Sequence, residues 1–388
     1  MYIALLGRQP ELSIAELERV FTDVTWFSDT SALIDTDDPI DIQRLGGSQK
    51  IGRVIKKLPA KEWRAVSLTI VQHYQKRWAT QDSKITLGMS AYGFSVSARD
   101  IQKTGLILKA KLKANGVSLR LIPNQDAALS TATAHHNKLG LSDTKVELLI
   151  VRSNDHVIIA ESIGTQNITA LAARDQGRPR RDAFVGMLPP KLALLMINLA
   201  GPLKSDHTPR VLDPFCGTGV VLQESMLHGY AAYGTDLAEK MIRYSHDNLT
   251  WLQDHAKLEG DWQLQEGDAM TTKWQHPIDA VVTEAYLGQP FSAPPSPAKL
   301  KEVRTNCNHI IGTFLKNIRP QLASGTPLVV AVPAWRSTTG ELTHLPLTQD
   351  LSAYGFSRIE LSTVATDRLA YFRPDQVVAR ELLLLTAL

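Results

Sequence analysis

A short glycine-rich segment contains the residues whose types and spacing most clearly indicate chemistry. It reads Asp213-Pro-Phe-Cys-Gly-Thr-Gly219 and follows an apolar run that predicts a strand. Glycines let the backbone approach a ligand closely, and the amides at the start of a following helix point outward. An acid ahead of the glycines disfavours a pyrophosphate, because two negative charges would meet without compensation. The segment therefore predicts a site for a small ligand that carries an amine or a sulfonium.

Two further aspartates end the next two predicted strands. Asp236 follows Asp213 by twenty-three positions and ends the run AAYGTD, and Asp268 ends WQLQEGD. The first is placed to accept hydrogen bonds from two ribose hydroxyls, and the second to hold an adenine amine. Each acid alone could be an ordinary cap or turn residue. The three in order, beside a glycine loop, predict a site for S-adenosylmethionine.

The fourth predicted strand ends in VVTEAYLGQP, which places Glu284 and Tyr286 beside the same ligand. An exocyclic base amine is a weak nucleophile, so a nearby carboxylate that accepts its protons and an aromatic ring that stacks the base would assist its reaction. We predict these two residues to be catalytic. The alternative is that Glu284 caps the following turn and Tyr286 packs against the crevice wall.

The elements that must position these residues alternate between strands and helices. Such alternation is typical of a parallel doubly wound sheet, which gathers ligands at the carboxyl ends of its strands. Helices are predicted from Pro190 and over 297–318, and two carboxyl-terminal runs are predicted to pair antiparallel at the sheet edge. Between residues 61 and 170, alternating apolar runs and one helix over 101–115 predict a smaller α+β unit.

Composition is that of an ordinary globular protein, with 388 residues, 44% hydrophobic and 21% charged. No apolar stretch is long enough to span a bilayer, so we expect no membrane association. The two cysteines, Cys216 and Cys307, form no Cys-x-x-Cys pair, which predicts a cytoplasmic protein with no structural metal. The formal charge of +3 is too small to indicate a polyanion partner by itself.

The ordered motifs DPFCGTG, GTD, EGDAM and TEAYLG, with RDQGRPRRDAFVGMLPPKLALLMINLA and LLGRQPELSIAELE before them, resemble a known family. It is the family of THUMP-domain tRNA guanine-N(2) methyltransferases that modify guanosine at position ten. The similarity covers nearly the entire chain. It implies a Rossmann-like α/β methyltransferase domain with a mostly parallel seven-stranded sheet, preceded by an α+β region. The implied parts are a ferredoxin-like domain over 1–60, a THUMP domain over 61–170, a linker over 171–188 and the methyltransferase domain over 189–388.

The resemblance also implies roles for individual residues. Asp213, Gly217 and Gly219 would line the methionine end of the cofactor, Asp236 the ribose, and Asp268 with Ala269 the adenine. The full expected set for S-adenosylmethionine is Leu188, Pro189, Asp213, Pro214, Phe215, Gly217, Thr218, Gly219, Asp236, Leu237, Asp268, Ala269 and Glu284. The chain departs from the family at the catalytic tetrad, where most relatives have Asp-Pro-Pro-Tyr and this sequence has Glu284-Ala285-Tyr286-Leu287.

Two basic segments are candidates for RNA binding. Six basic residues and one acid lie between Arg99 and Arg120, and Lys109 and Lys113 are one helical turn apart. The alternative for this segment is an ordinary solvated helix face. Four arginines surround a Gly-Pro break in the expected linker, and guanidinium groups bind phosphate in a bidentate manner. The residues expected to bind RNA are Arg99, Lys109, Lys113, Arg174, Arg178, Arg180 and Arg181.

These features predict an S-adenosylmethionine-dependent methyltransferase that acts on the exocyclic N(2) amine of a guanosine in tRNA, with no metal. Two alternatives remain open: a methyltransferase for an amino group of another RNA or of DNA, and a tRNA-binding protein without turnover because of the altered tetrad. The sequence leaves open whether a small activating subunit takes part.

Overall fold

The computed structural model describes residues 1–182 and 188–388, which form two compact units. The first unit contains residues 1–10, 21–43 and 47–170, and the second contains 11–20, 44–46 and 171–388. The expected linker therefore falls within the second unit, and residues 183–187 of it lie outside the described residues. No helix in the described ranges is both long enough and apolar enough to cross a membrane.

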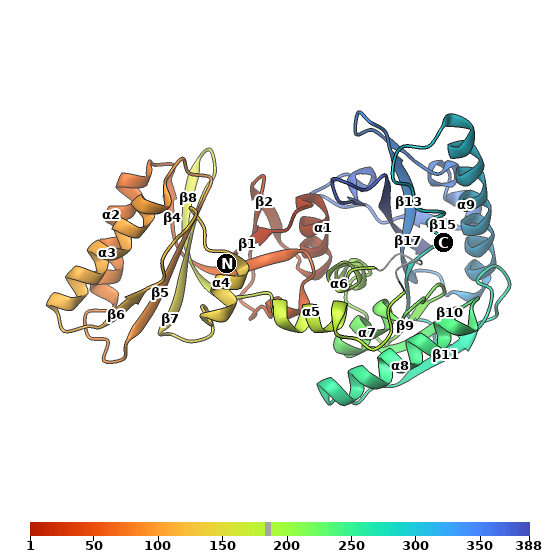
Figure 1. The fold of residues 1–388 in the computed structure, drawn as a ribbon, viewed down its shortest axis with the longest axis horizontal. Helices are drawn as coiled ribbons and strands as arrows, with labels where there is room; N and C mark the ends of the chain where they lie inside the picture. The colour runs from red at the N-terminus through yellow and green to blue at the C-terminus, as the bar shows by residue number, and fades with distance from the viewer. Residues whose placement is uncertain (183–187) are drawn as a thin grey trace. The chain divides into compact units, whose positions relative to one another are not determined.

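The first unit is built on one eight-stranded sheet with the order β2-β3-β1-β4-β8-β7-β5-β6 (Figure 1). Neighbouring strands are antiparallel except for β5, which runs parallel to β7 and β6. The strands are β1 Tyr2–Leu6, β2 Val24–Ser28, β3 Ser31–Ile34, β4 Ser48–Pro59, β5 Ile85–Tyr92, β6 Leu119–Leu121, β7 Lys145–Arg152 and β8 His156–Thr165. Because β4 pairs with both β1 and β8, the two expected amino-terminal regions share a single sheet. Their division at residue 60 stays a prediction.

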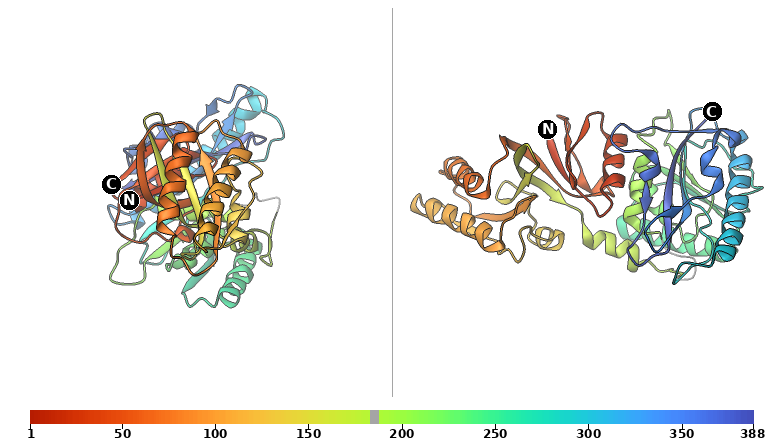
Figure 2. Two further views of the ribbon diagram at one scale, coloured as in Figure 1. Left: turned by 90° about the vertical axis from the view of Figure 1, so that its left-hand side faces the viewer. Right: turned by 90° about the horizontal axis from the view of Figure 1, so that it is seen from above.

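Two helices, α2 (Trp63–Arg77) and α3 (Ala98–Ala114), lie side by side on one face of this sheet (Figures 1 and 2). They bury an apolar stripe, as an amphipathic helix must, against β5, β7 and β8. The Ser97 hydroxyl caps α3 by accepting a hydrogen bond from the Asp100 amide at 3.2 Å. The helix predicted from the sequence is thus confirmed. Helix α4 (Thr131–His136) follows in the same unit, whereas α5 (Ile168–Gln176) begins in the first unit and continues into the second.

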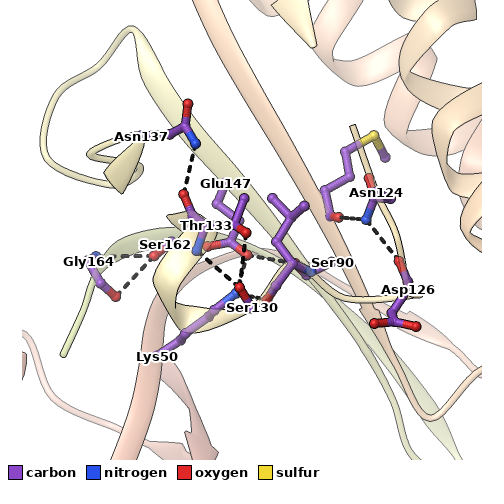
Figure 3. Close-up of polar contacts among 12 residues, drawn as sticks. Lys50, Ser90, Asn124, Asp126, Ser130, Thr133, Asn137, Glu147, Ser162 and Gly164 are labelled. Atoms are coloured by element: carbon purple, nitrogen blue, oxygen red, sulfur yellow. Dashed lines mark hydrogen bonds and ion pairs between the residues drawn. The ribbon is translucent and has the colours of Figure 1, made fainter. Parts of the chain in front are cut away.

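A buried ion pair lies inside the first unit, between Lys50 on β4 and Glu147 on β7 (Figure 3). Both side chains are almost fully buried. Lys50 Nζ also donates to the Leu129 carbonyl at 2.8 Å, and the Ser90 hydroxyl donates to Glu147 Oε1 at 2.6 Å. The Leu129 amide in turn donates to the Ser90 oxygen at 2.9 Å, so this network ties the loop before α4 to the sheet.

The second unit has a sheet with the order β11-β10-β9-β12-β13-β17-β15, with β14 and β16 pairing off this path. The strands from β11 to β13 are parallel, whereas β17 is antiparallel to both β13 and β15. The strands are β9 Arg210–Asp213, β10 Ala231–Asp236, β11 Trp262–Glu266, β12 Ala280–Glu284, β13 Pro327–Arg336, β14 Leu342–Thr343, β15 Phe356–Arg358, β16 Ala370–Tyr371 and β17 Val378–Ala387. The mostly parallel Rossmann-like sheet is confirmed: seven strands form its main order, and β14 and β16 bring the total within the described residues to nine.

Helices cover both faces of this sheet (Figure 1). The α-helices of the unit are α1 Pro10–Val20, α6 Pro190–Leu199, α7 Val220–Leu227, α8 Glu239–Ala256 and α9 Pro297–Ile318. Short 3-10 helices span Ile42–Arg44, Arg319–Gln321, Pro346–Gln349, Ser352–Tyr354 and Thr366–Arg368. Ala232 on β10 packs with α7 and α8, whereas its neighbour Tyr233 packs with α9. This alternation of side chains buries both faces, as parallel sheets require.

The amino-terminal helix α1 packs within the second unit through buried polar contacts. Glu16 Oε1 accepts hydrogen bonds of 2.7 Å from the Gly46 amide and from Asn198 Nδ2. Arg19 donates to the carbonyls of Leu199 and Ala200 at the end of α6. These bonds satisfy carbonyl groups that the end of α6 leaves without helical partners.

Candidate active site

A cavity of about 520 Å³ lies in the second unit at the carboxyl ends of its parallel strands. Its walls contain most of the residues that the sequence predicts to be at the site. These are Leu188, Asp213, Pro214, Phe215, Gly217, Thr218, Asp236, Leu237, Asp268, Ala269, Glu284 and Tyr286. Pro189, the N-cap of α6, and Gly219, the N-cap of α7, are not among the lining residues.

The glycine loop between β9 and α7 has a backbone that few other residues could adopt. Gly217 and Gly219 have φ angles of +51° and +81°, in the left-handed region. Helix α8 holds the loop in this shape: Ser245 Oγ donates to the Gly217 carbonyl at 2.8 Å, and Asn248 Nδ2 donates to the Thr218 carbonyl at 2.9 Å. The loop is therefore fixed before any ligand arrives.

Asp236 joins the end of β10 to this loop. Its Oδ2 accepts a hydrogen bond from the Gly217 amide, and its Oδ1 accepts one from the Ala238 amide, both at 2.9 Å. Burial raises the pKa of Asp236, and the two amide hydrogen bonds oppose that shift. A carboxylate at this strand end is placed where the sequence predicts contacts to ribose hydroxyls.

Asp213 at the end of β9 is buried and short of compensating positive charge. Thr283 Oγ1 donates to its Oδ1 at 2.5 Å, and the Phe215 amide donates to the same oxygen at 3.1 Å. Burial raises the pKa of Asp213 to about 7, and the negative charges of Asp236 and Glu284 add to the rise. A cationic ligand would remove this cost, so the site favours a group such as an ammonium or a sulfonium.

Asp268 lies two residues beyond the end of β11 and not in the strand itself. Its Oδ1 accepts a hydrogen bond from the Met270 amide at 2.9 Å, which stabilises the turn. The following residue, Ala269, is held by Asn317 Nδ2, which donates to its carbonyl at 3.0 Å. Asp268 thus acts as an ordinary turn residue, which was the alternative prediction for it, and it also lines the cavity.

The carboxylate of Glu284 at the end of β12 forms an ion pair with Arg380 of β17. Both side chains are mostly buried, with 13% and 8% exposed. Burial raises the pKa of Glu284, and the positive charge of Arg380 opposes the shift. Tyr286 is 43% exposed at the cavity wall. The expected pair of Glu284 and Tyr286 is therefore brought together at one cavity.

Arg380 was not predicted to be at the site, although the sequence around it contains a signal. In the run VVARELLLL, an arginine and the glutamate after it stand in an otherwise apolar predicted strand. Arginine is rarely buried unless it is paired, so its position called for an acidic partner. Asp182 was also not predicted; it lines the cavity and forms an ion pair of 2.6 Å with Lys240.

The arginines predicted to bind RNA have different surroundings. Arg178 is only 3% exposed, which corrects its expected role as a phosphate contact at the surface. Arg174 forms an ion pair of 2.6 Å with the buried Glu224. Arg180 is half-exposed and pairs with Asp247 at 2.6 Å, and Arg181 is exposed. In the first unit, Arg99, Lys109 and Lys113 are all exposed on α3.

Among the described residues, no three or more histidine, cysteine, aspartate or glutamate side chains are grouped in a way that could hold a metal ion.

The Rossmann-like sheet, the glycine loop and the acids at successive strand ends form a ligand site of the kind that doubly wound α/β domains place at the carboxyl ends of their strands. Residues 178–309 match the family described as the RMKL-like methyltransferase domain. The chain is also similar to curated tRNA (guanine(10)-N2)-dimethyltransferases. It is 32% identical over 161 residues to that of Methanothermobacter thermautotrophicus, covering 41% of this chain and 43% of the relative. It is 33% identical over 110 residues to that of Pyrococcus abyssi, covering 28% and 30%.

These matches confirm the expected resemblance to tRNA guanine-N(2) methyltransferases over the segments they cover. The chain spans less than half of the length of these curated relatives. Among solved structures, TrmN from Thermus thermophilus has a TM-score of 0.54 with 15% identity, covering 100% of this chain and 99% of that one. That similarity shows a shared fold along the whole chain.

Proposed function

We propose that this protein transfers a methyl group from S-adenosylmethionine to the exocyclic N(2) amine of a guanosine in tRNA, with position ten as the expected target. The observation that carries the proposal is the cavity where Asp213, Asp236 and Glu284 meet at the carboxyl edge of the sheet. The names of the similar curated proteins support tRNA guanine as the substrate.

The residues of the cavity suit S-adenosylmethionine. The buried Asp213, with its raised pKa, would gain a compensating positive charge from the amine and sulfonium. Asp236 would accept hydrogen bonds from the ribose hydroxyls, and Asp268 and Ala269 would lie at the adenine. Leu188 and Phe215 supply apolar wall beside these acids. When bound, the cofactor supplies an electrophilic methyl group.

Glu284 and Tyr286 would handle the acceptor base. The carboxylate would accept a hydrogen bond from the exocyclic amine, orient its lone pair and take up the proton that the nitrogen loses. The new nitrogen–carbon bond would form as the bond from the methyl carbon to the sulfonium sulfur breaks, which leaves S-adenosylhomocysteine as a neutral thioether. Tyr286 is exposed enough to stack on a base that has left its helix. The longer glutamate in place of aspartate still reaches the cavity, because it lines the wall.

The tRNA itself would be held by exposed basic side chains. In the first unit these lie on α3, and in the second unit they include Arg180 and Arg181. We propose that the first unit supplies the ferredoxin-like and THUMP regions that the family resemblance implies.

The direct test is mass spectrometry of nucleosides from tRNA incubated with the protein and S-adenosylmethionine. N2-methylguanosine or its dimethyl form is the expected product. Methylation of DNA or ribosomal RNA with none of tRNA would overturn the choice of substrate. Absence of both product and donor binding would overturn the enzymatic function.

The cofactor site has a separate calorimetric test. Asp236→Ala is expected to weaken donor binding by about 1–3 kcal/mol, in the range of a charge-assisted hydrogen-bond pair. The matched control is Asp254→Ala, an exposed acid on α8 that does not line the cavity. Equal donor affinity in the two variants would contradict the ribose assignment.

A further inference from the structure

The ion pair between Glu284 and Arg380 crosses an intervening strand. Strand β13 separates β12 from β17 in the sheet. Glu284 is in register with Ala331 of β13, whereas Arg380 is in register with Pro333, two residues further along. Residues in register, and residues two apart on one strand, share a face of the sheet. The Arg380 side chain therefore crosses β13 to reach the Glu284 carboxylate at the cavity wall. The small side chain of Ala331 leaves room for it to cross.

The two oxygens of the Glu284 carboxylate have different surroundings. Oε1 accepts a hydrogen bond from Arg380 Nε. Within the described part of the chain, Oε2 receives no hydrogen bond, and Arg380 is the cation paired with this acid. The negative charge of Glu284 in turn helps to raise the pKa of the buried Asp213, whereas the positive charge of Arg380 opposes the rise that burial imposes on the pKa of Glu284. Arg380 is thus the group that offsets the burial of the Glu284 charge.

The protonation state of this carboxylate decides which base it can bind. An ionised carboxylate only accepts hydrogen bonds, whereas a protonated one also donates. The Watson–Crick edge of guanine presents two donors, at N1 and at the N2 amine, while adenine presents an acceptor at N1 beside its amine. An ionised glutamate therefore suits guanine and opposes adenine, and a neutral glutamate loses this discrimination.

We propose that Arg380 is a positioning residue that determines base specificity: it keeps Glu284 ionised and leaves Oε2 directed to the donor edge of guanine. The inference rests on the proposed function and deepens it. Arg380 acts through Glu284, so removal of Arg380 matters only while Glu284 is present. Without the arginine, the buried carboxylate holds its proton more tightly, and the reaction needs a higher pH.

The test compares kcat for Arg380→Lys, Arg380→Ala, Glu284→Gln and the double variant Arg380→Ala/Glu284→Gln. Glu284→Gln is expected to lower kcat by about 100-fold or more. Arg380→Ala is expected to lose about tenfold at pH 7 and to recover towards pH 9, because the ascending limb of the pH profile moves upwards. Arg380→Lys keeps the charge and is expected to rescue most of the activity. The double variant is expected to be no slower than Glu284→Gln alone.

A matched control and a binding measurement separate this role from a structural one. Arg358→Ala removes an arginine of β15 that does not line the cavity, and its pH profile is expected to match the wild type. With S-adenosylhomocysteine present, the wild type is expected to bind tRNA with guanosine at the target position more tightly than tRNA with adenosine there. The single variant Arg380→Ala is expected to lose that preference. The double variant Arg380→Ala/Glu284→Gln is expected to keep the thermal stability of the wild type near neutral pH.

The outcomes distinguish the two proposals. A wild type that makes no N2-methylguanosine overturns the proposed function together with this inference. An active wild type combined with additive losses in the double variant, or with an unshifted Arg380→Ala profile and intact base preference, overturns the inference alone.

Discussion

The Thr283 hydroxyl donates a hydrogen bond of 2.5 Å to Oδ1 of Asp213, and this bond joins the ends of two neighbouring parallel strands, β12 and β9. Residue 283 directly precedes the candidate catalytic Glu284, and Asp213 begins the glycine loop. The contact therefore links the strand end that would hold the methyl acceptor to the one that would hold the donor. Burial of the Asp213 carboxyl group at this junction lowers the free energy of unfolding when the group is charged.

Asp213→Asn is expected to stabilise the free protein above pH 7 and to weaken donor binding at least tenfold. Because the pKa of Asp213 rises from 3.8 to about 7, the folded chain holds this proton more tightly than the unfolded chain does. The stability that this group contributes is full below about pH 4, falls as the pH rises from about 4 to 7, and stays lost above that. Asparagine keeps the shape of the aspartate side chain but carries no charge, so the variant does not lose this stability as the pH rises.

Thermal denaturation of Asp213→Asn at pH 5 and pH 8 measures this effect. The gain in Tm over the wild type is expected to be larger at pH 8 than at pH 5. The acids that face Asp213, Asp236 and Glu284, remain in both proteins, so the comparison isolates one carboxyl group. Asp254→Asn on α8 is the exposed control. An equal Tm difference at both pH values would contradict the charge cost.

The acids of the cavity could be predicted from the sequence because parallel strands bring their carboxyl ends to one edge. Asp213, Asp236 and Glu284 each end a strand of that edge, so their order in the chain was sufficient to place them together. Asp268 was predicted to end its strand; the structure has it at the same edge of the sheet, in the turn after the strand. The glycine loop was also predictable, since its two positive φ angles require glycine.

The ion pair of Arg380 and the burial of Arg178 could not be predicted from local sequence patterns. Arg380 comes from an antiparallel strand far along the chain, and its partner depends on the register of β17 against β13. Arg178 was expected to bind RNA phosphate because it belongs to the arginine-rich linker segment, yet the fold buries it. Pairing of β4 with β8 likewise joins distant segments into one sheet, which neither segment indicates alone. These features depend on long-range packing.

Gly219→Ala is expected to destabilise the protein by more than Gly229→Ala. Both glycines have positive φ angles, +81° and +88°, so each alanine pays the left-handed cost of about 1–2 kcal/mol. A Cβ atom at Gly219 would also lie 2.9 Å from Ser245 Oγ, which holds the glycine loop, whereas one at Gly229 meets nothing within 4 Å. Urea denaturation and donor titration of both variants measure the difference. Equal losses of stability and unchanged donor affinity would show that the loop tolerates the extra atom.

Lys109→Gln/Lys113→Gln is expected to flatten the salt dependence of tRNA binding. Both lysines are exposed on α3, and each phosphate contact contributes about one to the slope of log K against log salt. The slope should fall by about two if both contact RNA. Lys204→Gln/Lys301→Gln removes the same charge from exposed positions elsewhere and is the control. An equal change in both double variants would indicate a general charge effect in place of a contact on α3.

Lys50→Met is expected to destabilise the first unit by about 3–5 kcal/mol, because it leaves the buried Glu147 carboxylate without its cation. The backbone carbonyl of Leu129 also loses its donor, so the loop before α4 should loosen. Removing both charges in Lys50→Met/Glu147→Gln should restore part of the loss, since an uncharged pair needs no compensation.

Chemical denaturation of the single and double variants decides whether this pair stabilises the fold through its charges. The expected order of stability is wild type, then the double variant, then Lys50→Met. Arg77→Met breaks the more exposed ion pair with Glu161 and should cost about 1 kcal/mol or less, which makes it the matched control. If Lys50→Met were no less stable than Arg77→Met, solvent would have to reach Glu147. A double variant less stable than Lys50→Met would instead assign the loss to packing around Ser90 and Leu129.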